Sequence, residues 1–186
     1  MSLSNPKAPS SIDSASKVLN GYLWDSLKKI DHGLNGHYGT VKDRQGNVKE
    51  VVPIVPLHDS AGENMTWGDK PYLIYNKVFS RPKDPFYPVK REVFHFGLKA
   101  GVAQTFEWLT AIQMILDRQD DAAKDINKWN ATSEDHQHVF FHHLRIFQIE
   151  RTEPRDYSVK PAHITEFMVV AEYHYTEPLS YYFKNA

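Results

Sequence analysis

Apolar residues recur at three- and four-residue spacing in two stretches of the chain, and this spacing predicts amphipathic helices. The first stretch begins after residue 10 and predicts a helix of about five turns. Either Ser10 or Ser11 can cap its N-terminus, Asp13 lies in its first turn, and Gly33 follows its end. Its expected apolar face consists of Ile12, Ala15, Val18, Leu19, Tyr22, Leu23, Leu27 and Ile30.

The second stretch, residues 102–119, is the clearest helix of the chain, and a shorter helix over residues 120–130 follows it. Asp120 and Asp121 suit the N-terminus of the shorter helix because the helix dipole favours acidic side chains there. The expected buried stripe of the longer helix is Val102, Phe106, Leu109, Ile112, Ile115 and Leu116, widened by Trp108 and Met114.

Strands are predicted where apolar and polar positions alternate, or where β-branched and aromatic residues dominate. They cover residues 71–79, 89–98, 138–151 and 164–176. A further hairpin is expected between residues 38–41 and 48–52, because turn-forming residues separate them. Pro53 and Pro56 enclose a short extended segment, which we place at a sheet edge.

These strands cluster in hairpins instead of alternating with helices, which favours the α+β class over a doubly wound parallel sheet. We expect an antiparallel sheet of about four core strands, packed by a long helix and an N-terminal helix, with an additional β-hairpin and long loops. The length of 186 residues suits one domain. We expect a flexible N-terminal arm at residues 1–10, one domain over residues 11–178 and an aromatic C-terminal tail at residues 179–186.

Composition narrows the possible functions. The chain has no cysteine, which excludes disulfides, zinc–thiolate sites, iron–sulfur clusters and a cysteine nucleophile. Its formal net charge of -1 argues against a surface that reads nucleic acid, because such a surface is broadly basic. The chain lacks a Gly-x-Ser-x-Gly elbow, a phosphate-binding glycine loop and a His-Glu-x-x-His motif, so no pattern requires an enzyme. It also lacks the run of about 20 apolar residues that a membrane span needs, and we expect a soluble protein.

The histidines between residues 136 and 143 are the first candidates for site chemistry. His138 and His142 lie about 13 Å apart if they share a strand face, which is too far to bind one ion. A metal site would therefore need a ligand from the partner strand, such as His163 or His174. The spacing favours structural or interface histidines, and a metal-dependent enzyme that uses the region from His136 to His143 is the alternative.

Charged and aromatic residues in predicted loops are the candidates for protein contacts. Aromatic residues are enriched at protein interfaces, and the chain carries more of them outside its predicted core than a monomer needs. The basic loop after residue 80 could instead bind nucleic acid through the stretch from Lys77 to Arg91, or protect an edge strand. We favour protein docking because the whole chain is nearly neutral. The candidate interface residues are Arg81, Lys83, Phe86, Tyr87, Lys90, Arg91, Asp120, Asp121, Tyr181, Tyr182 and Phe183.

The order of several short motifs resembles the tail terminator, or tail completion, proteins of long-tailed bacteriophages, especially those with contractile tails. The motifs are Tyr22–Leu27, Val52–Pro56, Lys70–Tyr75, Arg118–Asn127 and Phe167–Tyr175. The string Arg-Gln-Asp-Asp-Ala-Ala-Lys-Asp-Ile-Asn at residues 118–127 is the most specific of them. The resemblance covers about residues 15–178 and leaves out the loop at residues 80–88 and the aromatic C-terminus.

The resemblance implies a structural virion protein without catalytic residues, metal or cofactor. Such a subunit forms a hexameric ring that ends the tail tube and joins the tail to the neck and head. Its implied partners are further copies of itself, the tail tube protein, the tail sheath protein where the tail contracts, and neck or connector proteins. DNA passes through the ring without being read by sequence. The implied location is the virion tail or neck, after assembly in the host cytoplasm, and a head-completion or connector ring is the nearest alternative.

Overall fold

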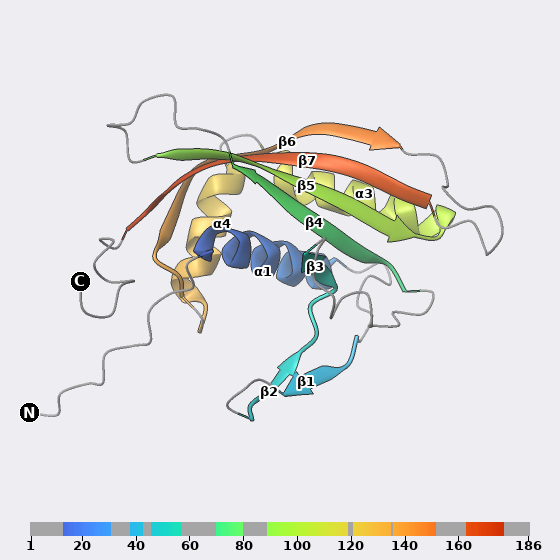
Figure 1. The fold of residues 1–186 in the computed structure, drawn as a ribbon, viewed down its shortest axis with the longest axis horizontal. Coiled ribbons are helices and arrows are strands. Elements are labelled where there is room, and N and C mark those ends of the chain that lie inside the picture. Colours follow the sequence, from blue (N-terminus) through green and yellow to red (C-terminus); the bar gives the residue numbers. More distant parts are fainter. Residues whose placement is uncertain are drawn as a thin grey trace, which may run out of the picture.

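Figure 1 shows the computed structural model of the protein. The structure describes residues 13–30, 38–42, 46–56, 70–79, 89–118, 121–134, 136–151 and 163–176. The elements are α1 (Ser14–Lys29), β1 (Thr40–Lys42), β2 (Val48–Glu50), β3 (Ile54–Pro56), β4 (Tyr72–Phe79), β5 (Lys90–Ala100), α3 (Val102–Leu116), α4 (Asp121–Thr132), β6 (Val139–Arg151) and β7 (His163–Tyr175). The chain therefore combines helices and a sheet in the α+β manner, and the four long predicted strands are confirmed.

The main sheet differs from the antiparallel sheet of about four strands that the sequence predicts. It has five strands in the order β3-β4-β5-β7-β6, and it is mixed because β3 runs parallel to β4. The remaining neighbours pair antiparallel. A parallel neighbour needs a long connection, and the chain between Pro56 and Tyr72 provides one. The edge position of the proline-flanked segment is confirmed, whereas its direction could not be read from local sequence.

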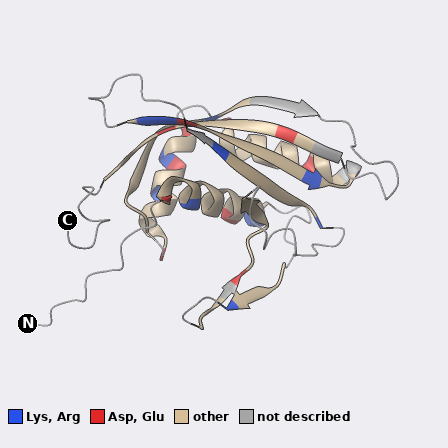
Figure 2. Cartoon of the chain, viewed as in Figure 1, with Lys and Arg blue, Asp and Glu red and all other residues tan. Residues whose placement is uncertain are grey.

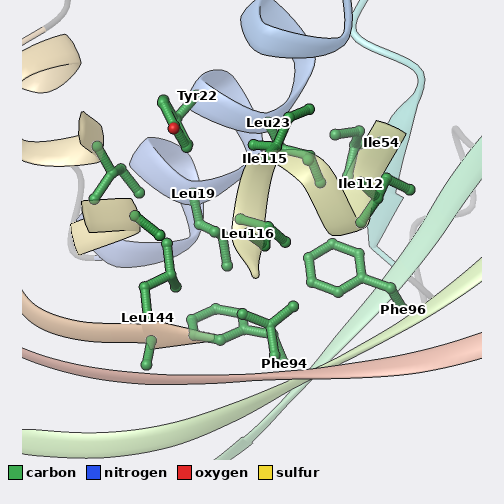
Figure 3. Packing of buried hydrophobic residues seen from close by; sticks show 14 of the residues in the cluster. Leu19, Tyr22, Leu23, Ile54, Phe94, Phe96, Ile112, Ile115, Leu116 and Leu144 are labelled. Atoms are coloured by element: carbon green, nitrogen blue, oxygen red, sulfur yellow. The ribbon is translucent and has the colours of Figure 1, made fainter. Parts of the chain in front are cut away.

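The helices lie on one face of the main sheet, and the core fills the space between the two layers (Figure 1). Leu19 and Leu23 of α1 and Ile112 and Leu116 of α3 have no measurable exposure. They point toward the aromatic side chains that β5 contributes (Figure 3). Each fully buried side chain of this kind contributes about 1.5–3 kcal/mol to folding. Alternation along β5 follows from this packing, since every second side chain faces the helices.

The first helix begins later than the apolar spacing suggests. Asp13 is its N-cap residue, and the carboxylate of Asp13 accepts a hydrogen bond from the Ser16 N–H at 3.4 Å. The expected caps Ser10 and Ser11 lie outside the described residues, as do Gly33 and the predicted arm at residues 1–10. The helix ends at Lys29, because Ile30 turns to an extended backbone conformation.

The buried face of α3 is narrower than the expected stripe, although Ile112, Ile115 and Leu116 are buried as predicted. Phe106 and Met114, predicted to be buried, are 60% and 65% exposed. Trp108 is buried as predicted, and it stacks on Trp24 of α1 with ring centroids 6.4 Å apart. Phe106 and Met114 lie beside exposed polar residues such as Glu107 and Thr110, so the apolar surface of the helix is wider than the face that meets the sheet.

The predicted hairpin is confirmed as the pair β1–β2, which forms a separate two-stranded sheet. Gly46 in the turn has a φ of 85°, a conformation that glycine adopts without steric cost. Val41 and Val48 are exposed, and Figure 1 shows the hairpin projecting away from the main sheet. In the described part of the chain, no helix has the length and apolar character that crossing a membrane requires.

Candidate functional site

Three of the predicted interface residues lie in the described part of the chain: Lys90, Arg91 and Asp121. The others lie outside the described residues, namely Arg81, Lys83, Phe86, Tyr87, Asp120, Tyr181, Tyr182 and Phe183. The predicted tail at residues 179–186 lies outside them as well. The structure therefore bears on one basic pair and one acidic residue of the expected interface.

The basic pair, Lys90 and Arg91, lies at the start of β5, and its two side chains lie in different environments. Arg91 points away from the helices, and its Nε lies 3.6 Å from a carboxylate oxygen of Glu172 on β7. Lys90 places its Nζ 4.9 Å from the ring centroid of Tyr175, which is a cation–π contact. Acidic and basic residues are interspersed over the described elements (Figure 2). The pair is therefore part of a surface of mixed charge.

Asp121 lies in the first turn of α4, as the sequence predicts. One of its carboxylate oxygens lies 3.0 Å from Lys124 Nζ, and Arg118 pairs with Asp125 at 3.2 Å. Both ion pairs are exposed and local, so each contributes little to stability. This arrangement agrees with the helix-dipole role that the sequence assigns to the acidic residues.

A further candidate surface is the side of the main sheet opposite the helices, here called the outward face. Among the described residues it includes Arg91, His95, Phe140, His142, His143, Arg145, Phe147, Val170, Glu172 and His174. Phe140 is 43% exposed and Phe147 is 61% exposed, which is unusual for aromatic side chains on a sheet. Among the described elements, all three helices lie on the other side of the sheet (Figure 1).

A pocket of about 360 Å³ opens on the outward face. Two arginines, Arg91 and Arg145, line it together with His143, Phe147, Val170 and Glu172. The register places Arg145 opposite Val170 and His143 opposite Glu172, so β6 and β7 build the pocket floor. Arginine beside an exposed aromatic ring is typical of the residues that dominate protein–protein binding.

Sequence reasoning did not single out Phe140, Arg145 or Phe147. Phe147 occupies one of two irregularities in the β6–β7 pairing, between Ile146 and Gln148. Such a bulge adds a residue to one strand and re-aims its side chain. The strict alternation assumed for a strand fails there. The sequence did contain one signal for these exposed residues. The strand has more large aromatic residues than one buried face can accommodate, so some of them must be exposed.

The predicted histidine region forms two separate pairs. The rings of His136 and His138 meet edge to face, with centroids 5.4 Å apart. His142 and His174 come from different strands, and His142 Nε2 lies 2.7 Å from His174 Nδ1. Burial, together with the neighbouring His142, lowers the pKa of His174. Among the described residues, no group of three or more His, Cys, Asp or Glu side chains could hold a metal ion.

A buried ionic network lies where the start of α1 meets the sheet. Lys77 Nζ lies 2.9 Å from Glu92 and 2.8 Å from Asp13, and the hydroxyl of Tyr173 donates a hydrogen bond to Glu92. Burial by itself lowers the pKa of Lys77, but the hydrogen bonds and charges of Asp13 and Glu92 outweigh burial and raise it. The network therefore holds Lys77 charged and joins α1 to β4 and β5.

A second pocket, of about 480 Å³, lies beside α1 and includes Asp13, Gly21, Tyr75 and Trp129 in its lining. A Cβ on Gly21 would lie only 2.7 Å from Cη2 of Trp129, so glycine lets α1 and α4 approach closely. Trp129 Nε1 donates a hydrogen bond to Asp25 at 3.0 Å. This pocket lies between α1, α4 and the strands β3 and β4, and two polar atoms of its lining, Ser16 Oγ and Asn20 Oδ1, are buried without a hydrogen-bond partner among the described residues.

Two asparagines of α4 close part of the exposed edge of the sheet. The Asn127 side chain donates to the Phe141 carbonyl at 2.7 Å and accepts from the Phe141 N–H at 2.9 Å. Asn130 bonds in the same way to Gln137, and it also donates to the Val139 carbonyl at 3.3 Å. These side chains take the place of a neighbouring strand, which limits pairing with another chain there.

No protein-family model matches the chain, and no curated protein matches it in sequence.

Proposed function

We propose that this protein is a structural subunit of a bacteriophage tail, a hexameric terminator ring that ends the tail tube and joins it to the neck. The proposal starts from the ordered motifs in the sequence. The most specific of them, residues 118–127, ends at Asn127, the residue that closes the β6 edge. A role in holding the fold together suits a motif shared among structural proteins.

The observation that carries the proposal is the composition of the outward face. Exposed Phe147 lines the 360 Å³ pocket together with Arg145, and exposed Phe140 lies on the same face beside His142 and His174. Exposed aromatic and arginine side chains of this kind are suited to binding another protein. In a ring, such a face contacts a different surface of the next copy, because heterologous contacts close into a cycle.

The ring is tested by mass photometry and negative-stain imaging, with and without purified tail tubes. We expect hexameric rings, either free or at tube ends. Phe147→Glu places a charge beside the pocket of the outward face and should reduce assembly. Met114→Glu is the matched control, because Met114 is 65% exposed on α3, on the opposite side of the sheet. A chain that stays monomeric and ignores tail tubes would contradict the proposal.

The partner assignment is tested separately. A tail terminator should bind the tail tube protein, and the sheath protein if the tail contracts, whereas a head-completion ring should bind connector proteins without tubes. We therefore expect co-sedimentation with tubes, reduced by Phe147→Glu and unchanged by Met114→Glu. If the chain binds connector proteins and not tubes, it is a head-completion ring of the neck and not a tail terminator.

A further inference from the structure

The contact between His142 and His174 is unusual for two like side chains on an exposed sheet face. His142 is the extra residue at a pairing irregularity of β6, between Phe141 and His143. The irregularity places its ring beside His174 of β7, with centroids 4.9 Å apart and planes at 30°. Phe140 packs against both rings, at 5.3 Å and 5.7 Å between centroids, which restricts their orientation.

The two ring nitrogen atoms that face each other lie about as close together as two ligands of one metal ion. His142 Nε2 and His174 Nδ1 are 2.7 Å apart. Two imidazole nitrogens bound to one ion at about 2.0–2.1 Å lie roughly 2.9–3.4 Å from each other, for bond angles between square and tetrahedral. Small ring rotations that move the two nitrogen atoms apart by a few tenths of an ångström would thus convert the hydrogen-bonded pair into a chelating pair.

We propose that His142 and His174 together bind one divalent transition-metal ion, such as Ni²⁺, Cu²⁺ or Zn²⁺, with water in the other coordination positions. Imidazole suits these ions, whereas Mg²⁺ and Ca²⁺ prefer oxygen ligands. In the described part of the chain, no third protein ligand completes the set. The site is therefore open and exchangeable, and it carries no claim of catalysis.

A second histidine pair of the same region provides a matched control. His136 and His138 also have adjacent rings, but these meet edge to face at 84°. His136 Nδ1 lies 2.9 Å from the backbone carbonyl of Asn130, so that nitrogen has a different partner. Removing His138 deletes one imidazole just before β6 and leaves the proposed chelating pair intact.

The proposal is tested by titrating the full chain with NiCl₂ and ZnCl₂ in a calorimeter, with MgCl₂ as the control salt. We expect one ion per chain for Ni²⁺ and Zn²⁺ and no binding of Mg²⁺. His142→Ala and His174→Ala should each weaken the binding by about tenfold or more, because one ligand of two is lost. His138→Ala should bind as the wild type does. Equal binding by His142→Ala, or an equal loss in His138→Ala, would overturn the proposal.

A second measurement uses the unmodified chain, so it does not depend on the folding of a variant. Substoichiometric paramagnetic Cu²⁺ should first broaden the NMR signals of His142, His174 and Phe140. If the signals of His136 and His138 broaden first, the site is elsewhere and the proposal fails. Neither outcome bears on ring assembly, which rests on the outward aromatic residues.

Discussion

At the scale of single residues, the least expected arrangement is the charge buried between α1 and the sheet. Glu92 and Lys77 have side chains that are 5% and 10% exposed, and they pair at 2.9 Å. Taking both charges out of water is costly, and a buried pair therefore needs further hydrogen bonds. Tyr173 donates one to Glu92, and Asp13 receives one from Lys77. The network fixes the position of the first helix more than it adds to stability.

Lys77→Met should lower the free energy of unfolding by about 3 kcal/mol, because it leaves the Glu92 carboxylate buried without its cation. Lys90→Met removes an exposed lysine from the same sheet and should change the free energy of unfolding by at most about 1 kcal/mol, because it loses only a cation–π contact with Tyr175. Urea denaturation measures both values. Equal effects of the two substitutions would show that the buried pair is not what stabilises this junction.

Asp13→Asn should make the protein less stable near neutral pH, with the loss disappearing in acid. Burial by itself raises the pKa of Asp13, but the hydrogen bonds from Lys77 and Ser16 and the charge of Lys77 outweigh it and lower the pKa. A lowered folded-state pKa gives stability that is fully present above the unfolded value of about 3.9 and is lost as the pH falls through the folded value.

The measurement is the difference in unfolding free energy between wild type and Asp13→Asn from pH 7 to pH 2. Asparagine keeps a capping oxygen, so the pH-dependent part reports the charge and not the cap. In a Lys77→Met background the pH-dependent part should shrink. A difference that stays constant across this range would argue against the ionic role of Asp13.

At the scale of elements, α4 acts on the sheet through its asparagines as well as through its apolar face. Ala122, Ala123 and Ile126 pack into the core, while Asn127 binds both backbone groups of Phe141. An edge strand with unpaired backbone groups can pair with other chains. The helix thus stabilises β6 and restricts where another strand can add.

Asn127→Ala should lower the free energy of unfolding by about 1–3 kcal/mol, because the N–H and carbonyl of Phe141 lose their partners. Amide exchange at Phe141 should speed up more than at neighbouring residues of the strand. Lys128→Ala, an exposed neighbour on the same helix, is the control and should leave both measurements unchanged. Unaltered exchange at Phe141 in Asn127→Ala would mean that the edge is closed in another way.

At the scale of the whole molecule, one face of the main sheet builds the core, and the outward face is the candidate surface for partners among the described residues. The hairpin β1–β2 lies apart from both, since all of β1 is exposed and β2 pairs only with β1 among the described strands. The stability of the fold therefore depends on the helices and the main sheet. Among the described residues, Val41 and Val48 of the hairpin and Phe140 and Phe147 of the outward face are exposed.

Replacing residues 41–49 by a short Gly-Ser linker should change the free energy of unfolding by only about 1 kcal/mol or less, because Val41, Lys42 and Val48 are exposed and bury little apolar area. Leu73→Ala, in the completely buried part of β4, should cost about 2–5 kcal/mol. Thermal and urea denaturation compare the two. A large loss in the linker variant would show that the hairpin belongs to the cooperative core.

The sequence by itself determined the local elements, because periodicity of apolar residues depends on neighbours in the chain. It predicted α4, the four long strands and the hairpin. It placed the histidines on a strand and named His174 as a partner for them. These features follow from spacing, propensity and turn chemistry alone.

Only the tertiary structure decided how those elements meet. Burial of Trp108 against Trp24 selected the inward face of α3, and long-range pairing set β3 parallel to β4. The bulge of β6 brought His142 to His174, although they are 32 residues apart in the chain. Such contacts depend on register and packing between distant segments, and a shift of one residue would turn each side chain to the opposite face.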